Sequence, residues 1–471
     1  MHPISKIALA AALLGATLAR AEPIIVDHVT LIDGTGRPAR PNMAVAVDGG
    51  RFTLVGPSIL AAGMAGRRID GRGKYLIPGL MDIHIHLAGF SRTAGKAWVP
   101  GAKPAGDRDW VVDRKVGEEA LGGFLYAGVT TVLDVGNIPQ NILPLRADER
   151  AGKILGPHIF ATGSPISYPG SHATEIAVNV VTWPEARAQL QAQFDSQHPD
   201  VEKIMYDDEG WGSRPLIPIL PLDLLQHVIE FYNDHGVRTT IHISNERRAR
   251  EAIYSGVDSL AHTPIQGPVT EAFVRLVAAK QIPMATTMTI GDNYSRVHDH
   301  PEFLDQPLYV ATMAPAERAR LKKIAAEGGE TALAGSPPLY QKSWRLWMKT
   351  QTPILQDNIR RIAAAGGVLA TGTDTSNGAS EQRELELLAE AGVPPLQIIT
   401  MATYNGARLM GKQADMGSIE EGKIADAVLL AADPTADIAN AKSILFVMKA
   451  GEIIDESKLP LAGGPRPRRM R

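Results

Sequence analysis

Short apolar segments alternate with amphipathic ones through the middle of the chain, residues 78–410. The apolar segments have the length and β-branched content of buried strands, and stretches between them, such as 222–236 and 270–281, carry apolar residues at helical spacing. The strand candidates lie at 75–86, 129–136, 158–164, 202–208, 238–244, 258–264, 283–289 and 368–375. Repeated alternation of strand and helix predicts an α/β fold of the (β/α)₈ TIM-barrel class.

The two ends of the chain have a different pattern. Residues 22–77 and 411–471 contain short alternating apolar runs separated by Gly-Gly, Asp-Gly and Ala-Gly turns, which are typical of β-hairpins. We expect both ends to pair into one small β-sandwich domain beside the barrel, with "GPRPRRMR" as a basic tail. The segment 290–350 is rich in Pro, Gly and charge, and predicts a loop or short helices over the barrel mouth.

Residues 1–21 have the pattern of a secretory signal peptide. Lys6 precedes the apolar run "IALAAALLGATLA", and Ala19-Arg20-Ala21 is a small-x-small cleavage site. The run is too short to span a membrane. We therefore expect a periplasmic or secreted protein without a stable membrane anchor.

The composition narrows the chemistry. The chain is 44% hydrophobic and 21% charged with a net charge of −3, so nothing in its charge indicates nucleic-acid binding. The absence of cysteine excludes disulfides, thiolate nucleophiles and cysteine-ligated metal. Any metal must be held by His, Asp, Glu or a lysine-derived group.

Residues of this kind gather near the ends of predicted strands. His84 and His86 stand two residues apart, so both side chains leave one face of a strand. His242, His262 and Asp374 end later strands, and Lys203 lies within another; barrel active sites lie at these carboxyl ends. The sequence thus predicts a metal site on several strands.

Purely structural roles for the same residues stay open. The histidine pair could belong to the core, Asp374 could cap a turn, and Lys203 could form a salt bridge beside a single metal. Asp82 lies on the same face of the strand as His84 and His86, and we expect it to hold them in position by hydrogen bonding. The motif "HDHP" at 298–301 could indicate an additional metal site, but we expect it to form a solvated loop. Neither a G-x-S-x-G elbow nor an H-E-x-x-H helix occurs.

Five motifs, "PGLMDIHIHL", "EKIMYDD", "TTIHIS", "SLAHTP" and "TGTDTS", occur in this order, and "MGSIEEGKIADAVLL" follows them. In these motifs the chain resembles the amidohydrolase superfamily, in its binuclear imidazolonepropionase-like and prolidase-like branch. The resemblance implies two divalent metal ions. Zinc is the expected metal, because imidazole ligands suit it. It also implies a homo-oligomer.

The resemblance further implies a role for each metal-type residue. His84, His86 and Asp374 would hold the more buried ion, and His242 and His262 the second. Lys203, carboxylated by CO₂, would bridge the two ions as a carbamate. Two ions can activate a shared hydroxide, and Asp374 would take a proton from it and deliver that proton to the leaving amine.

Substrate contacts are expected from two loops. His172 lies in "GSPISYPGSHATE", where the branch carries a histidine facing the substrate, although Gly-Ser-His stands here in place of the usual Gly-Gly-His. Tyr206, Trp211 and Arg214 follow Lys203 and are placed where a side chain could meet a substrate carboxylate.

These observations predict an enzyme that hydrolyses an amide or peptide C–N bond of a small molecule. An X-Pro or other dipeptide, an N-acyl amino acid or an aryl amide fits best. A lactone, cyclic amide, carbamate or phosphotriester hydrolase is the alternative, because loops rather than the fold choose the substrate. A non-catalytic binding protein is disfavoured because all six metal-type positions are present.

Overall fold

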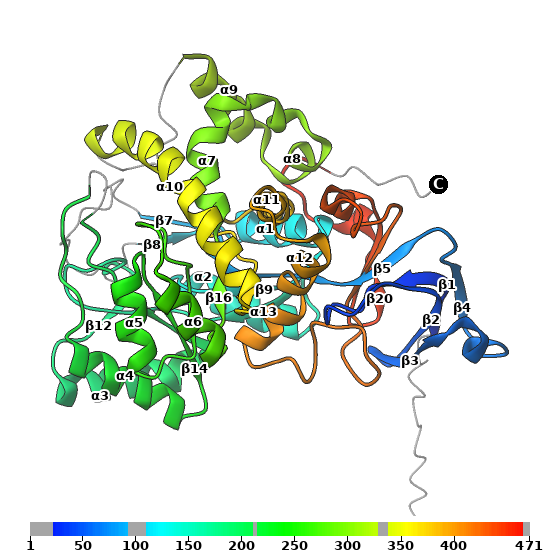
Figure 1. The fold of residues 1–471 in the computed structure, drawn as a ribbon, viewed down its shortest axis with the longest axis horizontal. Helices are drawn as coiled ribbons and strands as arrows, with labels where there is room; N and C mark the ends of the chain where they lie inside the picture. The colour runs from blue at the N-terminus through cyan, green and yellow to red at the C-terminus, as the bar shows by residue number, and fades with distance from the viewer. Residues whose placement is uncertain (1–21, 93–109, 211–213, 328–337, 465–471) are drawn as a thin grey trace, which may run out of the picture.

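The computed structural model describes residues 22–92, 110–210, 214–327 and 338–464. The expected signal peptide, Trp211 and nearly all of the basic tail lie outside the described residues. Within the described ranges, every helix is too short or too polar to cross a membrane. A larger α/β part lies at the left of Figure 1, and a sheet built from both chain ends lies at the right.

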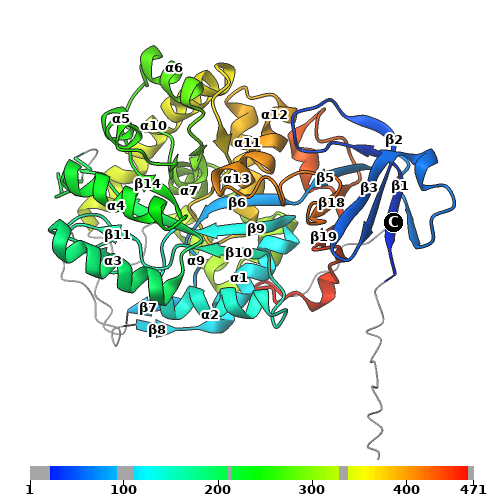
Figure 2. The same ribbon diagram turned by 90° about the horizontal axis from the view of Figure 1, so that it is seen from below.

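Every predicted strand range in the middle of the chain contains a strand paired in parallel. These strands are β6 (Leu80–Ile85), β9 (Val129–Asp134), β10 (His158–Ala161), β13 (Val201–Met205), β14 (Arg238–His242), β15 (Ser259–Leu260), β16 (Met284–Ala285) and β17 (Leu369–Ala370). The first three form one sheet, which Figure 2 shows side by side. The others form a second sheet with β11 (Ile166–Ser167) and β12 (Val178–Asn179). The α/β class with parallel strands is thus confirmed.

Hydrogen bonds join both edges of the three-stranded sheet, β10 and β6, to segments of the other parallel sheet or next to it. Beyond β10, the backbone N–H of Asp200 donates to the carbonyl of Ala161 at 3.0 Å. At the other edge, Ile85 and Thr375 form a parallel bridge, and the N–H of Asp374 donates to the carbonyl of His84 at 2.7 Å. These bonds bring the β6 and β17 ends together, although the two strands are far apart in sequence.

Helices alternate with these strands and cover the sheets from outside (Figure 2). They are α1 (Arg114–Tyr126), α2 (Pro139–Arg150), α3 (Trp183–Gln197), α4 (Leu222–Asp234), α5 (Glu246–Tyr254), α6 (Glu271–Lys280), α11 (Gly378–Glu390), α12 (Pro395–Met401) and α13 (Tyr404–Leu409). Side chains of Asp113, Asn245, Thr270 and Asn377 cap α1, α5, α6 and α11 by accepting N–H bonds of the first turn.

Strands from both chain ends share one eight-stranded sheet, in the order β20-β19-β18-β5-β1-β2-β3 with β4 beside β1. They are β1 (Ile24–Leu31), β2 (Arg40–Asp48), β3 (Arg51–Pro57), β4 (Arg67–Asp70), β5 (Tyr75–Pro78), β18 (Ala427–Leu430), β19 (Ile444–Lys449) and β20 (Glu452–Ile453). The antiparallel β5–β18 pair joins the two ends. A two-layer sandwich and the domain boundaries near 77 and 410 stay predictions.

The single strand expected at 75–86 is divided at Pro78, and that expectation is wrong. β5 belongs to the end sheet, whereas β6 belongs to a parallel sheet. Pro78 has no N–H to donate, and Gly79 passes so close to Thr130 that a β-carbon would lie 2.0 Å from its hydroxyl oxygen. The chain changes sheets at these two residues, and β6 enters the parallel sheet with His84 near its end.

The segment expected as a loop or short helices is mostly helical. It forms α7 (Met288–Asp299), a 3₁₀ turn η3 (Pro301–Asp305), α8 (Pro307–Thr312), α9 (Pro315–Glu327) and α10 (Pro338–Ala364), at the top of Figure 1. Short helices are confirmed for α7 to α9, but α10 has 27 residues despite Pro353 in its interior. Its buried Leu355, Ile359 and Ile362 repeat at helical spacing, and this packing outweighs the proline.

Candidate metal centre

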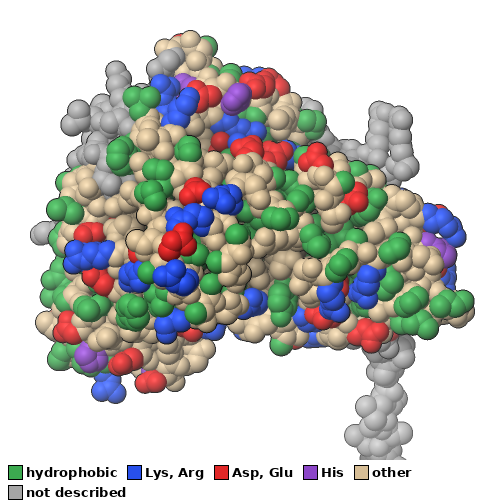
Figure 3. Space-filling view, in the orientation of Figure 1, with side chains coloured by type: hydrophobic (Ala, Val, Ile, Leu, Met, Phe, Trp, Pro, Cys, Tyr) green, Lys and Arg blue, Asp and Glu red, His purple; other side chains and the backbone are tan. Residues whose placement is uncertain are grey.

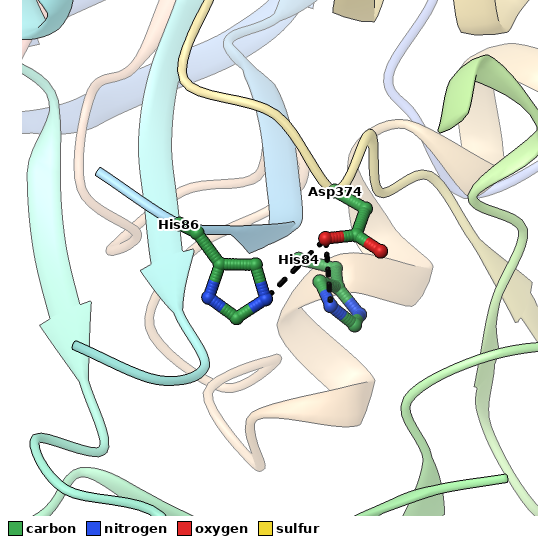
Figure 4. Close-up of side chains that lie close together, drawn as sticks. All are labelled: His84, His86 and Asp374. Atoms are coloured by element: carbon green, nitrogen blue, oxygen red, sulfur yellow. Dashed lines mark ion pairs between the residues drawn. The ribbon is translucent and has the colours of Figure 1, made fainter. Parts of the chain in front are cut away.

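Three predicted ligands meet at the carboxyl ends of β6 and β17. The Nε2 atom of His86 lies 3.3 Å from Oδ1 of Asp374, and Nε2 of His84 lies 3.8 Å from the same oxygen (Figure 4). One ligand atom from each of the three side chains lies within 4.8 Å of the others. Among the described residues, His84, His86 and Asp374 are the one group of three or more His, Asp or Glu side chains close enough to share an ion. The residues of "HDHP" do not form such a group.

Backbone carbonyls fix the orientation of both β6 imidazoles. Nδ1 of His84 lies 2.7 Å from the carbonyl of Ala261, and Nδ1 of His86 lies 2.8 Å from that of Gly136. A carbonyl only accepts, so each Nδ1 carries a proton and each Nε2 faces Asp374. Burial above all holds the pKa of His84 well below its usual range, which keeps this ring neutral. Neutral imidazole is the form that binds zinc.

Asp374 is held in an unusual backbone conformation. Its φ of 55° is left-handed, a region that an aspartate adopts more readily than most residues. Its neighbour Thr373 donates from Oγ1 to Asp82 at 2.6 Å, and Asp82 is fully buried. Asp82 therefore anchors the segment that carries Asp374, as its strand parity predicts.

Lys203 lies on β13 and is fully buried. Its Nζ has no hydrogen-bond partner among the described residues, although it lines the same cavity as His86 and Asp374. Burial lowers the pKa of the Lys203 ammonium to about 7, against the opposing charges of Asp374 and Asp134. A large share of this amine is thus neutral near neutral pH, which is the form that can react with CO₂.

His242 and His262 form a second group in contact with the first. Nδ1 of His242 lies 3.0 Å from Nε2 of His262, and the His262 ring lies 4.4 Å from the His84 ring, centroid to centroid. The other ring nitrogens have partners of their own: Asp207 at 3.6 Å from His242, and the hydroxyl of Thr287 at 2.9 Å from His262. Burial lowers the pKa of His242 to about 3 and that of His262 well below its usual range.

These residues fit divalent ions with nitrogen and oxygen ligands. Asp207 and Thr287 lie at the outer nitrogens of His242 and His262, so the two facing nitrogens, 3.0 Å apart, are the atoms that could bind one cation together. The orphaned Nε2 of His84 and Nζ of Lys203 are further buried polar atoms without a protein partner in the described residues. Such atoms need a partner, and metal ions would provide it.

A buried glutamate links the two expected substrate contacts. Oε1 of Glu209 lies 3.1 Å from Nδ1 of His172 and accepts a hydrogen bond from Nη1 of Arg214 at 2.9 Å. His172 also stacks on His242, with ring centroids 4.5 Å apart and an interplanar angle of 13°. Although burial opposes it, the bonds from His172 and Arg214 keep the pKa of Glu209 below its ordinary value. Glu209 thus remains an anion that fixes both side chains at the cavity.

Tyr206 does not join this group, and its expected substrate contact is corrected. Its hydroxyl donates to Glu251 on α5 at 2.9 Å, on the outer side of β13, and Arg248 lies over its ring. Lys203 points inward and strand side chains alternate, so Tyr206, three residues on, points outward.

The same alternation points to residues that the sequence reading missed. Asp207 and Glu209 have the parity of Lys203, and both are buried beside the cavity residues His242 and His172. The run "YDDEG" carried the signal, because buried acids directly after a strand need partners.

A cavity of about 240 Å³ joins these groups, and we call it the metal pocket. Its lining includes His86, His172, Lys203, Arg214, His242, His262 and Asp374. His84 is not among the lining residues and is only 1% exposed, but its ring contacts that of His262. The lining of the pocket thus combines the expected metal ligands with a guanidinium and a further imidazole.

A comparison with known families now shows to which family the chain belongs. The model of the amidohydrolase family matches residues 75–454. The chain belongs to the amidohydrolase family. It is an enzyme, a hydrolase that acts on carbon–nitrogen bonds, as the motifs predict.

Individual relatives are distant but cover most of the chain. Ochratoxinase of Aspergillus niger is 23% identical over 481 residues, which cover 96% of this chain and 91% of the relative. Imidazolonepropionase of Legionella pneumophila strain Paris is 24% identical, covering 85% of this chain and 91% of the relative. Among solved structures, an Xaa-Pro dipeptidase with bound methionine superposes with a TM-score of 0.70 at 22% identity, covering 92% of this chain and 99% of that one. This last likeness concerns the fold.

Proposed function

We propose that this amidohydrolase uses two divalent metal ions, preferably zinc, to hydrolyse the amide bond of a small substrate with a free carboxylate, such as an N-acyl amino acid or a dipeptide. The observation that carries the proposal is the position of Lys203. Its buried amine, without a polar partner in the described residues, lines one pocket together with His86, Asp374, His242 and His262.

The ligand assignment follows from this arrangement. His84, His86 and Asp374 would hold one ion, and His242 and His262 the other. Lys203, as its carbamate, would bridge them, because carboxylation turns a cation that repels metal into a bidentate anion. When bound, the ions supply an activated water molecule and polarise the substrate carbonyl.

The remaining steps belong to the chain's own side chains. Asp374 faces the pocket, and its buried carboxylate can take the proton released during attack and deliver it to the leaving amine. Arg214, held by Glu209, offers its remaining N–H donors to a carboxylate in the pocket, and Glu209 holds the His172 ring there as well. A substrate anchored there would place its amide over the ligand groups.

Four further features are proposed with the function. The hydrogen bonds at both sheet edges support closure of the parallel strands into one barrel. The shared end sheet supports a sandwich domain, and residues 1–21 support export to the periplasm or medium. A homo-oligomer follows only from the family resemblance. Mass spectrometry of the exported protein, with a new N-terminus at Glu22 expected, tests the cleavage site.

Amine release by zinc-loaded mature protein tests the proposed reaction. The panel contains X-Pro dipeptides, other dipeptides, N-acyl amino acids, an aryl amide, a lactone and a phosphotriester. Lys203→Ala should abolish amide turnover, whereas Lys153→Ala, at an exposed lysine, should retain it. Turnover of only the lactone or phosphotriester would overturn the amide assignment and keep the metal site.

A further inference from the structure

We propose that an apolar cavity next to the metal pocket receives a bulky uncharged acyl group, so that the enzyme prefers N-acylated amino acids to free dipeptides. The inference rests on the proposed function and names its substrate class. It concerns the part of the substrate on the far side of the scissile bond from the carboxylate.

The cavity has a volume of about 570 Å³ and opens at the metal ligands. His86, Asp374, Ile290 and Tyr294 line both it and the metal pocket, whereas Lys203, Arg214 and His172 line only the metal pocket. A substrate with its carboxylate at Arg214 and its amide at Asp374 therefore directs its acyl group into this cavity.

The walls of the cavity are mainly apolar and come from the helices at the top of Figure 1. Ile290, Tyr294 and Val297 come from α7, and Phe303, Tyr309, Met313 and Leu321 from the segments that follow. A cavity of about 150 Å³ already holds a benzene ring, so this one has room for a branched or fused aromatic group. Burial of such a group from water would be favourable in proportion to its apolar area.

Several polar groups in the lining are already engaged by the chain itself. The hydroxyl of Ser376 accepts from the N–H of Ala88 at 2.7 Å, and Oδ1 of Asn377 accepts from the N–H of Ala379 at 2.9 Å. The hydroxyl of Tyr309 accepts from Arg296 at 2.9 Å. Arg320, also in the lining, is paired with Glu317 through two hydrogen bonds of 2.7 Å. The cavity therefore presents mainly apolar faces, with several of its polar groups already engaged.

A free dipeptide carries an α-ammonium group next to its scissile carbonyl, and this cation needs an acceptor. Among the described residues that line the cavity, Asp374 is the only carboxylate, and the metal centre uses it. An ammonium group there would lose water without gaining a carboxylate partner of its own. An acyl group without the amine avoids this penalty.

Two substrate comparisons test the inference, with the amino acid fixed as the best in the panel above. In an acetyl, butanoyl and hexanoyl series, kcat/KM should rise about three- to fourfold per methylene group, the increment for burying one CH₂. The 4-methylpentanoyl derivative should exceed the corresponding leucyl dipeptide at least tenfold, although the two differ only in the α-amino group.

A matched pair of variants locates the effect. Leu321 and Leu308 are both half-buried and pack against the same cluster around Phe303, but only Leu321 lines the cavity. Leu321→Trp should reduce the hexanoyl-to-acetyl ratio of kcat/KM at least fivefold, whereas Leu308→Trp should keep the wild-type ratio. The chain-length series in wild type needs no variant to fold.

The outcomes separate the two proposals. Amide turnover with a flat chain-length series, or with the leucyl dipeptide as good as its acyl analogue, overturns this inference and leaves the proposed function intact. Absence of any amide turnover contradicts the proposed function and, with it, this inference.

Discussion

Replacing Arg214 by methionine separates two roles of this side chain. In the structure Arg214 shares the Glu209 carboxylate with His172, and it lies where a substrate carboxylate would bind. Arg214→Met removes the guanidinium but keeps much of the aliphatic volume. We therefore expect an effect on stability through Glu209 and a separate effect on catalysis through the substrate.

The size of the stability effect follows from burial. The Glu209 side chain is 1% exposed and that of Arg214 is 26% exposed. Losing one charged partner of a buried carboxylate costs up to about 5 kcal/mol. His172 still faces the same oxygen and water reaches Arg214, so a loss of about 1–3 kcal/mol is expected.

The catalytic effect is specific to carboxylate substrates. A charge-assisted hydrogen bond is worth about 1.5–3 kcal/mol, so kcat/KM should fall roughly 10- to 150-fold, mainly through KM. The methyl ester of the same substrate lacks the carboxylate charge and should lose less than about threefold.

Steady-state kinetics on the acid and its ester, with thermal unfolding of each variant, measure both effects. The double variant Glu209→Gln/Arg214→Met should recover stability, since no unpaired anion stays buried, but should not recover turnover of the acid. Equal losses on acid and ester would refute the assignment of Arg214 to the substrate carboxylate.

Three further results are expected. Asp374→Asn should lower kcat at least about 10³-fold with the fold retained by circular dichroism, because an amide cannot take the proton; near-normal kcat would remove Asp374 from catalysis. His158 lies 3.2 Å from Asp426 and 3.5 Å from Glu149, which also pairs with Lys449; despite burial, these acids raise the pKa of His158 to about 9. The pKa of His158 in the folded protein lies above its unfolded value of about 6.5, so the charged imidazole stabilises the fold by at most about 3 kcal/mol. This stabilisation is complete below about pH 6.5 and is lost as the pH rises through about 9. A His158→Gln variant that keeps the wild-type pH dependence of thermal unfolding would contradict this. Gly378→Ala should destabilise the protein by about 1–3 kcal/mol, because the new β-carbon would lie 2.4 Å from the Gly123 carbonyl oxygen; an unchanged melting temperature would argue against the tight α1–α11 contact.

The fold was predictable where local pattern and packing agree. Each apolar run in the middle of the chain became a parallel strand, since a buried strand needs little beyond its own apolar residues. The pattern failed at Pro78, where two sheets meet, and in α10, where burial of Leu355 and Ile359 outweighs Pro353.

The site was predictable to a different extent. His84, His86 and Asp374 meet as expected because strand ends in a parallel arrangement converge. Glu209 was missed because the run after the strand indicates only that buried acids need partners, whereas the partner itself, His172, lies 37 residues away. Tyr206 was misplaced although the two-residue period, counted from Lys203, already directs it outward.

Charge on the visible surface agrees with a small-molecule enzyme. On the face in Figure 3, Lys and Arg side chains are interspersed with Asp and Glu rather than gathered in one basic area. The net charge of the chain, −3, is likewise small and not basic. Specific recognition is therefore expected from the pocket, where Arg214 and His172 are fixed, rather than from long-range attraction.

Metal content tests the central claim most directly. Wild-type protein, Lys203→Met and the control Lys153→Met would be loaded with zinc, freed of excess metal, and measured by inductively coupled plasma mass spectrometry. We predict two zinc ions per chain in wild type and in the control, and at most one in Lys203→Met, which cannot form the bridging carbamate. One zinc or none in wild type, or two retained in Lys203→Met, would contradict a binuclear centre bridged by Lys203.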